Sequence, residues 1–314
     1  MKYFITGGAG FIGSNITDRL FQTESCQIVI FDDFSGGRSA FLKSHFGKPG
    51  FKLIEGDVLD STSLEKAMKG CNFVIHLSAN PDIARGSVET DLDIKQSVLG
   101  SYNVLESMRN QGIKQLAFTS GSGVYGDVGS VETAENYGPL FPVSMYGASK
   151  LGAEAIISAF CHMFGMTSWF FRFANVVGGR QTHGVGYDFL HKLRKDPSKL
   201  VILGNGLQSK SYIHVSDAIS AMLIAIRNTN EPVNVFNVAT GDYISVNEIA
   251  QIVCNEMGLR EPEFSYTGGE RGWTGDVPVV RLNSKRIRKL GWRPKYSAAE
   301  AVRYSIRELL QDLD

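Results

Sequence analysis

The 314-residue sequence is poor in cysteine and has no long apolar run. Its four cysteines are too far apart in the chain to form the close pairs of a zinc site, and such sparse use is typical of a reducing compartment; they are Cys26, Cys71, Cys161 and Cys254. No stretch of about 20 apolar residues suggests a membrane-spanning helix. No basic, then apolar, leader precedes the first predicted strand. We therefore expect a cytoplasmic protein with reduced cysteines.

An excess of charge of either sign is also absent. Lys and Arg number 32, as do Asp and Glu, so the formal net charge is +0. A neutral chain without basic runs has no field that would draw it to nucleic acid or to an acidic membrane. No metal site is expected, because neither His183 nor His191 has a partner at ligand spacing. The length suffices for one large α/β domain and a smaller lobe.

In the first half of the chain, short apolar strands alternate with amphipathic helices. The predicted strands are Tyr3–Thr6, Ile28–Phe31, Lys52–Glu55, Phe73–Leu77, Gln115–Thr119 and Ser168–Phe173. The predicted helices are Ile12–Phe21, Leu64–Lys69, Val98–Asn110 and Tyr146–Phe164. This alternation predicts an α/β fold with a Rossmann-type, doubly wound parallel sheet. Such sheets bind ligands at the carboxyl ends of their strands.

Beyond Ala174 the pattern becomes irregular, with glycine-rich loops at 177–180 and 203–206. Val233–Val238 is a further strand candidate that could rejoin the sheet. We expect one domain of residues 1–173 together with about 211–250. Residues 174–210 and 251–314 should form a smaller, interleaved C-terminal substrate lobe.

A glycine-rich turn, residues 6–13 (TGGAGFIG), lies between the first strand and the first helix. In this context glycines allow a tight turn and close approach of the backbone to a pyrophosphate, which then faces the helix N-terminus. Asp32 ends the second strand, where a carboxylate accepts the ribose hydroxyls of NAD and repels the extra phosphate of NADP. Arg38 is an alternative clamp for that phosphate, but Asp32 argues against it. A tight turn without a ligand remains the alternative.

Tyr146 and Lys150 are four residues apart, on one face of a predicted helix. A surface pair is the ordinary explanation of this spacing. The helix, however, leads into the sixth strand of a dinucleotide fold. There Lys150 could bind the nicotinamide ribose and, together with the positive nicotinamide ring, lower the pKa of Tyr146. A phenolate can take a proton from a substrate hydroxyl while hydride leaves for NAD.

Four motifs together resemble the extended short-chain dehydrogenases/reductases: residues 6–13, His76-Leu77-Ser78-Ala79, Val124-Tyr125-Gly126 and Tyr146-x-x-x-Lys150. More narrowly, they resemble the NAD-dependent epimerase/dehydratase family, and UDP-glucose 4-epimerases most of all. The resemblance covers nearly the whole chain. It implies that Tyr146 is the catalytic acid/base, that Lys150 is its partner and that NAD is tightly held. It also implies a homodimer formed by the Val98–Asn110 and Tyr146–Phe164 helices.

The resemblance completes the set of expected site residues. Those expected to contact NAD are Gly7, Gly10, Phe11, Ile12, Gly13, Asp32, Asp33, Asp57, Val58, Leu77, Ala79, Thr119, Tyr146 and Lys150. For Asp57 the alternative is an ordinary cap of the next helix. Those expected to bind a nucleotide-sugar, with UDP as the expected nucleotide, are Asn175 at the diphosphate, Lys210 and Tyr212 beside the base, and the pair Arg271 and Asp276 at diphosphate and ribose.

Three positions depart from the family pattern. Gly121 stands where the family has a Ser or Thr that binds the reacting sugar oxygen; Ser120 and Ser122 flank it and are the remaining catalytic candidates, or they bond only to backbone. Lys210 replaces an Arg and cannot make the same bidentate contact. Val280 aligns with the position that gates N-acetyl groups, and its small size suggests room for a 2-acetamido sugar.

The expected reaction is 4-epimerisation through a transient 4-keto sugar. The family's 4,6-dehydratases need an Asp-Glu pair at the positions of Ser122 and Gly123, and its decarboxylases need a Glu at the second of these. A uronate epimerase, a dehydratase, a reductase and a non-catalytic NAD-binding protein remain alternatives. Arg85 either reads a uronate carboxylate or, more simply, makes a surface ion pair. His76 is expected to be structural, and Trp273 and Trp292 to pack in the small lobe.

Overall fold

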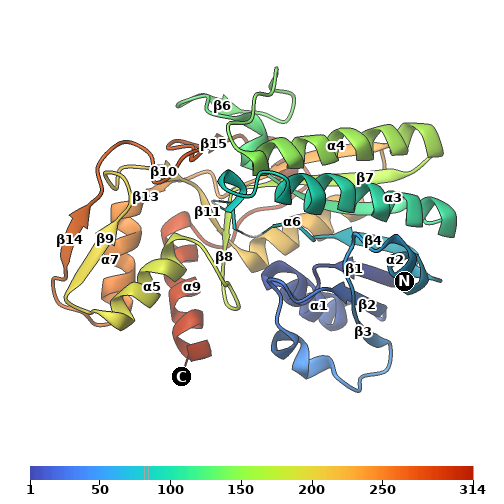
Figure 1. Cartoon of the computed structure of the whole chain (residues 1–314), viewed down its shortest axis with the longest axis horizontal. Helices are drawn as coiled ribbons and strands as arrows, with labels where there is room; N and C mark the ends of the chain where they lie inside the picture. Colours follow the sequence, from blue (N-terminus) through green and yellow to red (C-terminus); the bar gives the residue numbers. More distant parts are fainter. Residues whose placement is uncertain (81, 84, 314) are drawn as a thin grey trace.

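Seven parallel strands form the central sheet, in the order β12-β7-β5-β4-β1-β2-β3 (Figure 1). We describe a computed structural model that covers residues 1–80, 82–83 and 85–313. The strands are β1 (Lys2–Thr6), β2 (Gln27–Asp32), β3 (Phe51–Glu55), β4 (Phe73–His76), β5 (Gln115–Gly121), β7 (Thr167–Phe173) and β12 (Val233–Val238). The chain winds outward from β1 in both directions, so a topological switch point lies between β1 and β4. The predicted α/β, doubly wound fold is confirmed.

Helices cover both faces of this sheet, because its strands are apolar on both sides. On one face α1 (Phe11–Thr23) and α6 (Val215–Asn228) bury residues such as Leu20 and Met222 against Ile5. On the other face α2 (Ser61–Met68), α3 (Gly100–Gln111) and α4 (Met145–Phe164) bury residues such as Leu64 and Ile157 against Phe4. Side chains of β1 thus alternate between two cores, as a strand period of two requires.

A smaller lobe stands at one end of the sheet, at the left of Figure 1. Its helices α5 (Val185–Lys195), α7 (Val246–Glu256) and α9 (Ala298–Leu313) surround a third apolar core that contains Leu190, Ile249 and Val302. Short strands complete the lobe and its junction with the sheet: β6 (Glu132–Thr133), β8 (Asn175–Val177), β9 (Lys199–Ile202), β10 (Ser209–Lys210), β11 (Tyr212–His214), β13 (Ile244–Ser245), β14 (Glu263–Tyr266) and β15 (Arg281–Leu282).

The expected boundaries of the two units need two corrections. Residues 246–250 were expected in the larger domain, but they begin α7 and pack in the third core. Residues from α8 (Lys285–Lys289) to Trp292 were expected in the lobe, but they pack in the core beneath the sheet. The indole of Trp292 donates a hydrogen bond to the Asp217 carbonyl on α6, which fixes this segment there.

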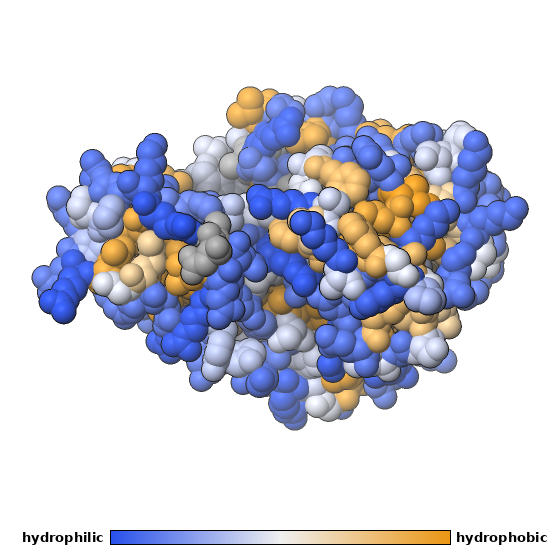
Figure 2. Space-filling view, turned by 90° about the horizontal axis from the view of Figure 1, so that it is seen from below, coloured by the Kyte–Doolittle hydropathy of each residue, from blue (hydrophilic) through white to orange (hydrophobic). Residues whose placement is uncertain are grey.

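Four short helical segments adjoin the cavity or the sheet: η1 (Ser39–His45), η2 (Arg85–Ser87), η4 (Ser122–Tyr125) and the π-helical η3 (Ile94–Leu99). The predicted helix start at Val98 falls within η3, which continues directly into α3. Among the helices described, none combines the length and apolar character needed to cross a bilayer. The face seen from below Figure 1 is mostly hydrophilic, with apolar side chains exposed in several separate places (Figure 2).

Candidate active site

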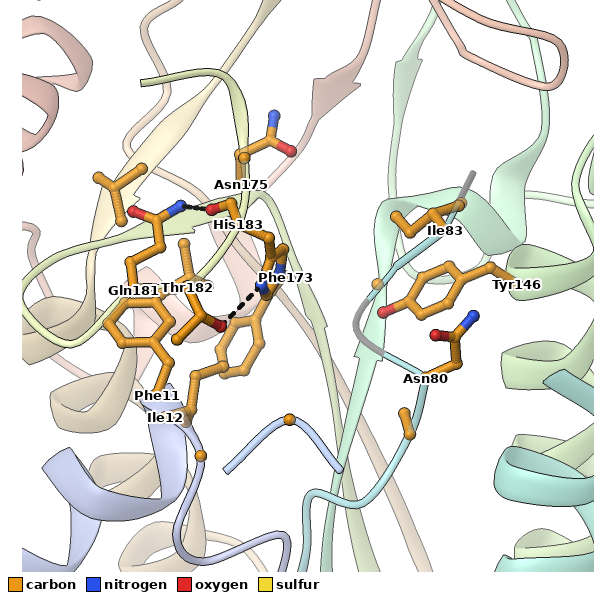
Figure 3. A pocket seen from close by; sticks show the side chains of 18 of the residues that line it. Phe11, Ile12, Asn80, Ile83, Tyr146, Phe173, Asn175, Gln181, Thr182 and His183 are labelled. Carbon is orange, nitrogen blue, oxygen red and sulfur yellow. Dashed lines mark hydrogen bonds between the residues drawn. The ribbon is translucent and has the colours of Figure 1, made fainter. Parts of the chain in front are cut away.

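A cavity of about 600 Å³ lies where the carboxyl ends of the strands meet the smaller lobe. Figure 3 shows its two walls: Tyr146, Asn80 and Ile83 belong to one, and the other carries Phe11, Ile12, Gln181, Thr182 and His183. Its position matches the ligand crevice of an open α/β sheet. Every residue expected to contact NAD lines this cavity.

The glycine-rich turn has the geometry that its sequence predicted. Gly7 has a φ of +64°, and a Cβ there would lie 2.9 Å from the Ser78 nitrogen. A Cβ on Gly13 would lie 2.4 Å from the Gly7 carbonyl oxygen, so only glycine lets α1 start this close to β1. Gly10 precedes α1, and Phe11, Ile12 and Gly13 of the first turn line the cavity. Free N–H groups of a first helical turn form a site for a pyrophosphate.

Asp32 lies at the end of β2, at the cavity wall. Its carboxylate accepts hydrogen bonds from the Ala9 nitrogen at 2.8 Å and the Phe34 nitrogen at 2.9 Å, so it also braces the glycine-rich turn. Burial raises its pKa. Arg38 is exposed beside Phe41 and does not line the cavity. The wall therefore fits NAD, whose ribose hydroxyls need an acceptor, better than NADP.

Asp57 and Val58 line the cavity beyond β3. The alternative role of Asp57 as a helix cap is wrong, because Asp60 caps α2 by accepting a hydrogen bond from the Ser63 nitrogen. Asp57 instead accepts a hydrogen bond from the Leu59 nitrogen, which tightens the loop.

Tyr146 and Lys150 lie in the first two turns of α4. The Ser144 hydroxyl caps this helix by accepting a hydrogen bond from the Gly147 nitrogen. Lys150 is 2% exposed, and its ammonium donates to the Thr119 carbonyl at 2.8 Å and lies 5.7 Å from the centre of the Tyr146 ring. Both side chains line the cavity, so the explanation as a surface pair is wrong.

The expected lowering of the Tyr146 pKa is not found in the protein chain itself. Burial, with a further contribution from Asp93, raises the pKa of Tyr146 to about 12. Burial also lowers the pKa of Lys150 to about 8. Both shifts favour the neutral form, because a poorly solvated site disfavours charge. A bound cation beside the phenol would act in the opposite direction.

Gly121 leaves open space next to the reactive phenol. Its backbone is extended (φ −158°), a conformation that any residue adopts. A Cβ there would lie 3.8 Å from the Tyr146 hydroxyl oxygen. Ser120 and Ser122 also line the cavity, and within the described part of the chain the buried Ser120 hydroxyl has no hydrogen-bond partner. The chain therefore has hydroxyls beside the missing one, but not in its place.

The residues expected to bind a nucleotide lie at the lobe end of the cavity, with one exception. Asn175, Lys210, Tyr212 and Asp276 line it, and Lys210 forms an ion pair with Asp276 at 2.6 Å. Arg271 does not line it: its guanidinium pairs with Asp127 at 2.6 Å and with the Asp276 carbonyl. In this structure the guanidinium of Arg271, expected at the diphosphate and ribose, therefore lies outside the cavity lining.

The remaining candidates have plain roles. His76 is buried between the Thr6 and Ser101 hydroxyls and is structural, since burial lowers its pKa to about 3. Arg85 pairs with Glu89 on the surface, outside the cavity lining. Trp273 lines the cavity, contrary to its expected packing role. Among the described residues, no cluster of three metal-ligating side chains occurs.

Several lining residues were not expected at this site from the sequence: Asn80, Gln181, Thr182, His183 and Asp188. They belong to the loop after β4, the loop after β8 and the first turn of α5. These segments carry no motif of their own. The only available signal was the rule that loops at the carboxyl ends of parallel strands meet at the ligand site.

The fold and cavity define a dinucleotide-binding enzyme with a tyrosine–lysine pair. A family comparison makes this specific, because residues 3–239 match the model of the NAD dependent epimerase/dehydratase family. The chain belongs to this family, and the family's cofactor is NAD. The glycine-rich turn, Asp32 and Lys150 are arranged as that cofactor requires.

Individual relatives match the chain over nearly their full lengths. The chain is 33% identical, over 95% of each sequence, to a putative UDP-glucose 4-epimerase of Methanocaldococcus jannaschii. A crystal structure of a UDP-galactose 4-epimerase is 36% identical, with a TM-score of 0.89 and complete coverage of both chains. The UDP-glucose complex of a Thermotoga maritima UDP-glucose 4-epimerase is 28% identical, with a TM-score of 0.89 and the same coverage.

Proposed function

We propose that this protein is an NAD-dependent nucleotide-sugar 4-epimerase whose substrate is a UDP-linked hexose. The observation that carries the proposal is a single cavity in which three groups meet: the dinucleotide turn with Asp32, the Tyr146–Lys150 pair, and the polar lobe end with Lys210 and Asp276. A dinucleotide and a nucleotide-sugar would enter from the two ends. The reacting part of each would then meet at Tyr146.

The chemistry assigned to the chain is proton transfer at one atom. The Tyr146 oxygen takes the proton from the C4 hydroxyl of the sugar, and Lys150 holds the nicotinamide ribose and supports the phenolate. NAD supplies a reversible hydride acceptor and a positive ring beside the phenol. Asn175, Lys210 and Asp276 hold the nucleotide while the 4-keto sugar rotates in the site and presents its other face. Tyr146 then returns the proton to the C4 oxygen.

Epimerisation is favoured over dehydration by the residues beside the phenol. Elimination of water needs a carboxylic acid near the leaving hydroxyl, and Ser122 and Gly123 stand where the family's dehydratases have Asp and Glu. A uronate substrate is not supported by Arg85, which pairs with Glu89. Epimerisation needs only one base and a reversible hydride acceptor. The relatives named as UDP-glucose and UDP-galactose 4-epimerases support this choice.

The test is product analysis by NMR and mass spectrometry after incubation with UDP-glucose, UDP-N-acetylglucosamine and UDP-glucuronate. We expect the C4 epimer of at least one UDP-hexose, with no net consumption of NAD(P)H. Val280 in the cavity wall leads us to include the acetamido sugar. The Tyr146→Phe variant should bind NAD but lose nearly all turnover. Stoichiometric oxidation of NAD(P)H would identify a reductase, and loss of water from the sugar would identify a dehydratase.

We also propose a homodimer through α3 and α4, which pack side by side (Figure 1). Their outer surface carries exposed apolar side chains, namely Leu99 just before α3, Tyr102 on α3 and Met163 on α4. The ring of Tyr102 packs against Phe160 of α4, which joins the two helices at this surface. Exposed apolar surface of this kind is typical of an interface.

A further inference from the structure

A carboxyl group is buried behind the wall that carries Tyr146. It belongs to Asp93, directly before η3, and the residue is 0% exposed. Its Oδ1 accepts a hydrogen bond from the Asn80 amide at 3.2 Å, whereas its Oδ2 has no hydrogen-bond partner among the described atoms. Burying an incompletely paired carboxylate is costly. A group of this kind needs an explanation beyond packing.

The chain leaves room for this carboxyl beside the catalytic helix. A Cβ on Gly86 would lie 2.1 Å from Asp93 Oδ2 and 3.7 Å from the Met145 Cβ. A side chain at position 86 would therefore displace the carboxyl from its present place, which is close to Met145, the residue before Tyr146. Its partner Asn80 lines the cavity on the same wall as Tyr146 (Figure 3). Asp93 is thus connected to the site twice, through Asn80 and through the start of α4.

Among the residues that the structure describes, few other charges face this carboxyl. From α4, which packs against η3, they are Tyr146, Lys150 and, one turn further, Glu154, whose charge is paired with Arg172. His76 of β4 is neutral at physiological pH, since its pKa lies at about 3. The pairs Arg85–Glu89 and Asp91–Lys95 lie exposed at the surface, where water and salt screen them.

The charge of Asp93 acts on the pKa of Tyr146 and on the pKa of Lys150 in the same direction. Its negative charge adds to the burial that raises the pKa of Tyr146, and it opposes the burial that lowers the pKa of Lys150. Burial raises the pKa of Asp93 itself, and the Asn80 amide and the Lys150 ammonium oppose this rise. Burial alone would deprotonate Lys150 at a lower pH. A carboxylate at this position therefore keeps the ammonium charged and delays ionisation of the phenol.

We propose that Asp93 is a positioning residue that holds the Tyr146–Lys150 pair in its protonated state and so sets the pH range of the reaction. The inference rests on the proposed function for its kinetic test, but not for the physical tests below. Asp93 touches neither substrate nor cofactor in this account. It acts through its charge and through Asn80.

The kinetic test is the pH profile of kcat/KM for Asp93→Asn, which keeps the shape and the acceptor for Asn80 but removes the charge. Both limbs, one for ionisation of Tyr146 and one for ionisation of Lys150, should move to lower pH by about 1 unit. Glu89→Gln and Asp91→Asn, which remove exposed charges from the same segment, should leave the profile in place. An unmoved profile for Asp93→Asn, or a uniform loss of activity at every pH, would overturn the proposal.

A second test needs no substrate. The ultraviolet absorbance of tyrosinate, taken as the difference between a protein and the same protein with Tyr146→Phe, reports ionisation of Tyr146 in the NAD complex. Asp93→Asn should lower its midpoint, and an unchanged midpoint would contradict the role of Asp93. A wild type that converts no nucleotide-sugar but shows this shift would refute only the proposed function.

If Asp93→Asn fails to fold, the effect of Lys150 on the titration of Asp93 tests the proposal in proteins that keep Asp93. Carbon-13 NMR of labelled aspartate follows the Asp93 carboxyl in the wild type and in Lys150→Met. Removal of the ammonium should raise the midpoint of Asp93, because coupled groups shift each other. A midpoint that stays the same in both proteins would show that the two groups do not interact.

Discussion

Lys150 and Tyr146 show how burial acts on the proposed catalytic pair. The side chain of Lys150 is almost fully buried, and among the described residues its ammonium donates to one acceptor, the Thr119 carbonyl. Its pKa falls to about 8, below the ordinary value of 10.5 that applies when the chain is unfolded. The folded state therefore carries a cost whenever Lys150 is charged. This cost is constant below pH 8 and disappears as the pH rises toward 10.5.

Replacing Lys150 by Met should therefore stabilise the protein at neutral pH, although it removes a functional group. We expect the free energy of unfolding to rise by about 1–3 kcal/mol at pH 7, after allowance for the lost hydrogen bond. The gain should shrink between pH 8 and 10.5, because the wild type itself becomes more stable there. Urea unfolding of both proteins at pH 7 and pH 10 measures this. Equal stability at pH 7 would show that burial of the ammonium is already fully compensated.

Gly121 offers a gain-of-function test at the phenol. The position a Cβ would take lies 3.8 Å from the Tyr146 oxygen, and the backbone is extended, so Ser fits without strain. A hydroxyl placed there can hydrogen-bond the reacting sugar oxygen, which should raise kcat by about tenfold. Gly121→Ala, which adds the carbon without the hydroxyl, is the matched control. Equal rates for the two variants would show that Ser120 or Ser122 already fills this role.

At the scale of elements, a buried ion pair joins β7 to α4, the helix that carries the proposed catalytic pair. Arg172 and Glu154 meet at 2.6 Å, each with 6% of its side chain exposed, and Arg172 also donates to the Tyr125 hydroxyl. Glu154 lies one turn beyond Lys150. The pair therefore fixes the height and rotation of the helix that carries both catalytic side chains.

Breaking this pair should destabilise the fold, since it leaves a buried guanidinium without its counter-charge. We expect Glu154→Gln to lower the free energy of unfolding by about 3 kcal/mol. Glu106→Gln, which breaks the exposed pair with Arg109 on α3, should change it by less than about 0.5 kcal/mol. Thermal and urea unfolding compare the two. A similar, small effect in both variants would contradict a fastening role for Arg172.

The strands of the sheet could be predicted from the sequence, whereas several helices could not. The six strands predicted in the first half all occur, and Val233–Val238 joins them as β12, because buried parallel strands are short apolar runs bounded by turns. The helices α5, α6 and α7 were not predicted. Apart from β12, the strands between them have only two to four residues, which are too short to show a period. The third core places α5 and α7, and the core beneath the sheet places α6; both are tertiary features.

The site divides in the same way. Gly7, Asp32, Tyr146 and Lys150 could be found because local geometry fixes them: a turn, a strand end and one helix face. The direction of Arg271 could not, because it depends on Asp127, a residue 144 positions away that offers a competing partner. The raised pKa of Tyr146 could not be predicted from the sequence either, because desolvation depends on every surrounding element.

At the scale of the whole molecule, the proposed dimer explains why α3 and α4 expose apolar side chains. Leu99 and Met163 are 48% and 71% exposed. We expect a dimer in analytical ultracentrifugation, and the combination Leu99→Glu with Met163→Glu should dissociate it while NAD binding is retained. Val201→Glu, at an exposed apolar position on β9 of the smaller lobe, is the control and should remain dimeric. A monomeric wild type would refute this interface.

The cavity is lined by residues of both the sheet and the smaller lobe. A labelled substrate tests whether it holds sugar and NAD together. UDP-glucose carrying deuterium at C4 is incubated with the wild type in ordinary water, and the products are examined by NMR. If one cavity holds sugar and NAD against Tyr146, UDP-galactose forms with the deuterium still at C4. Loss of the label to solvent, or the absence of any C4 epimer from this and the other UDP-hexoses, would contradict the account.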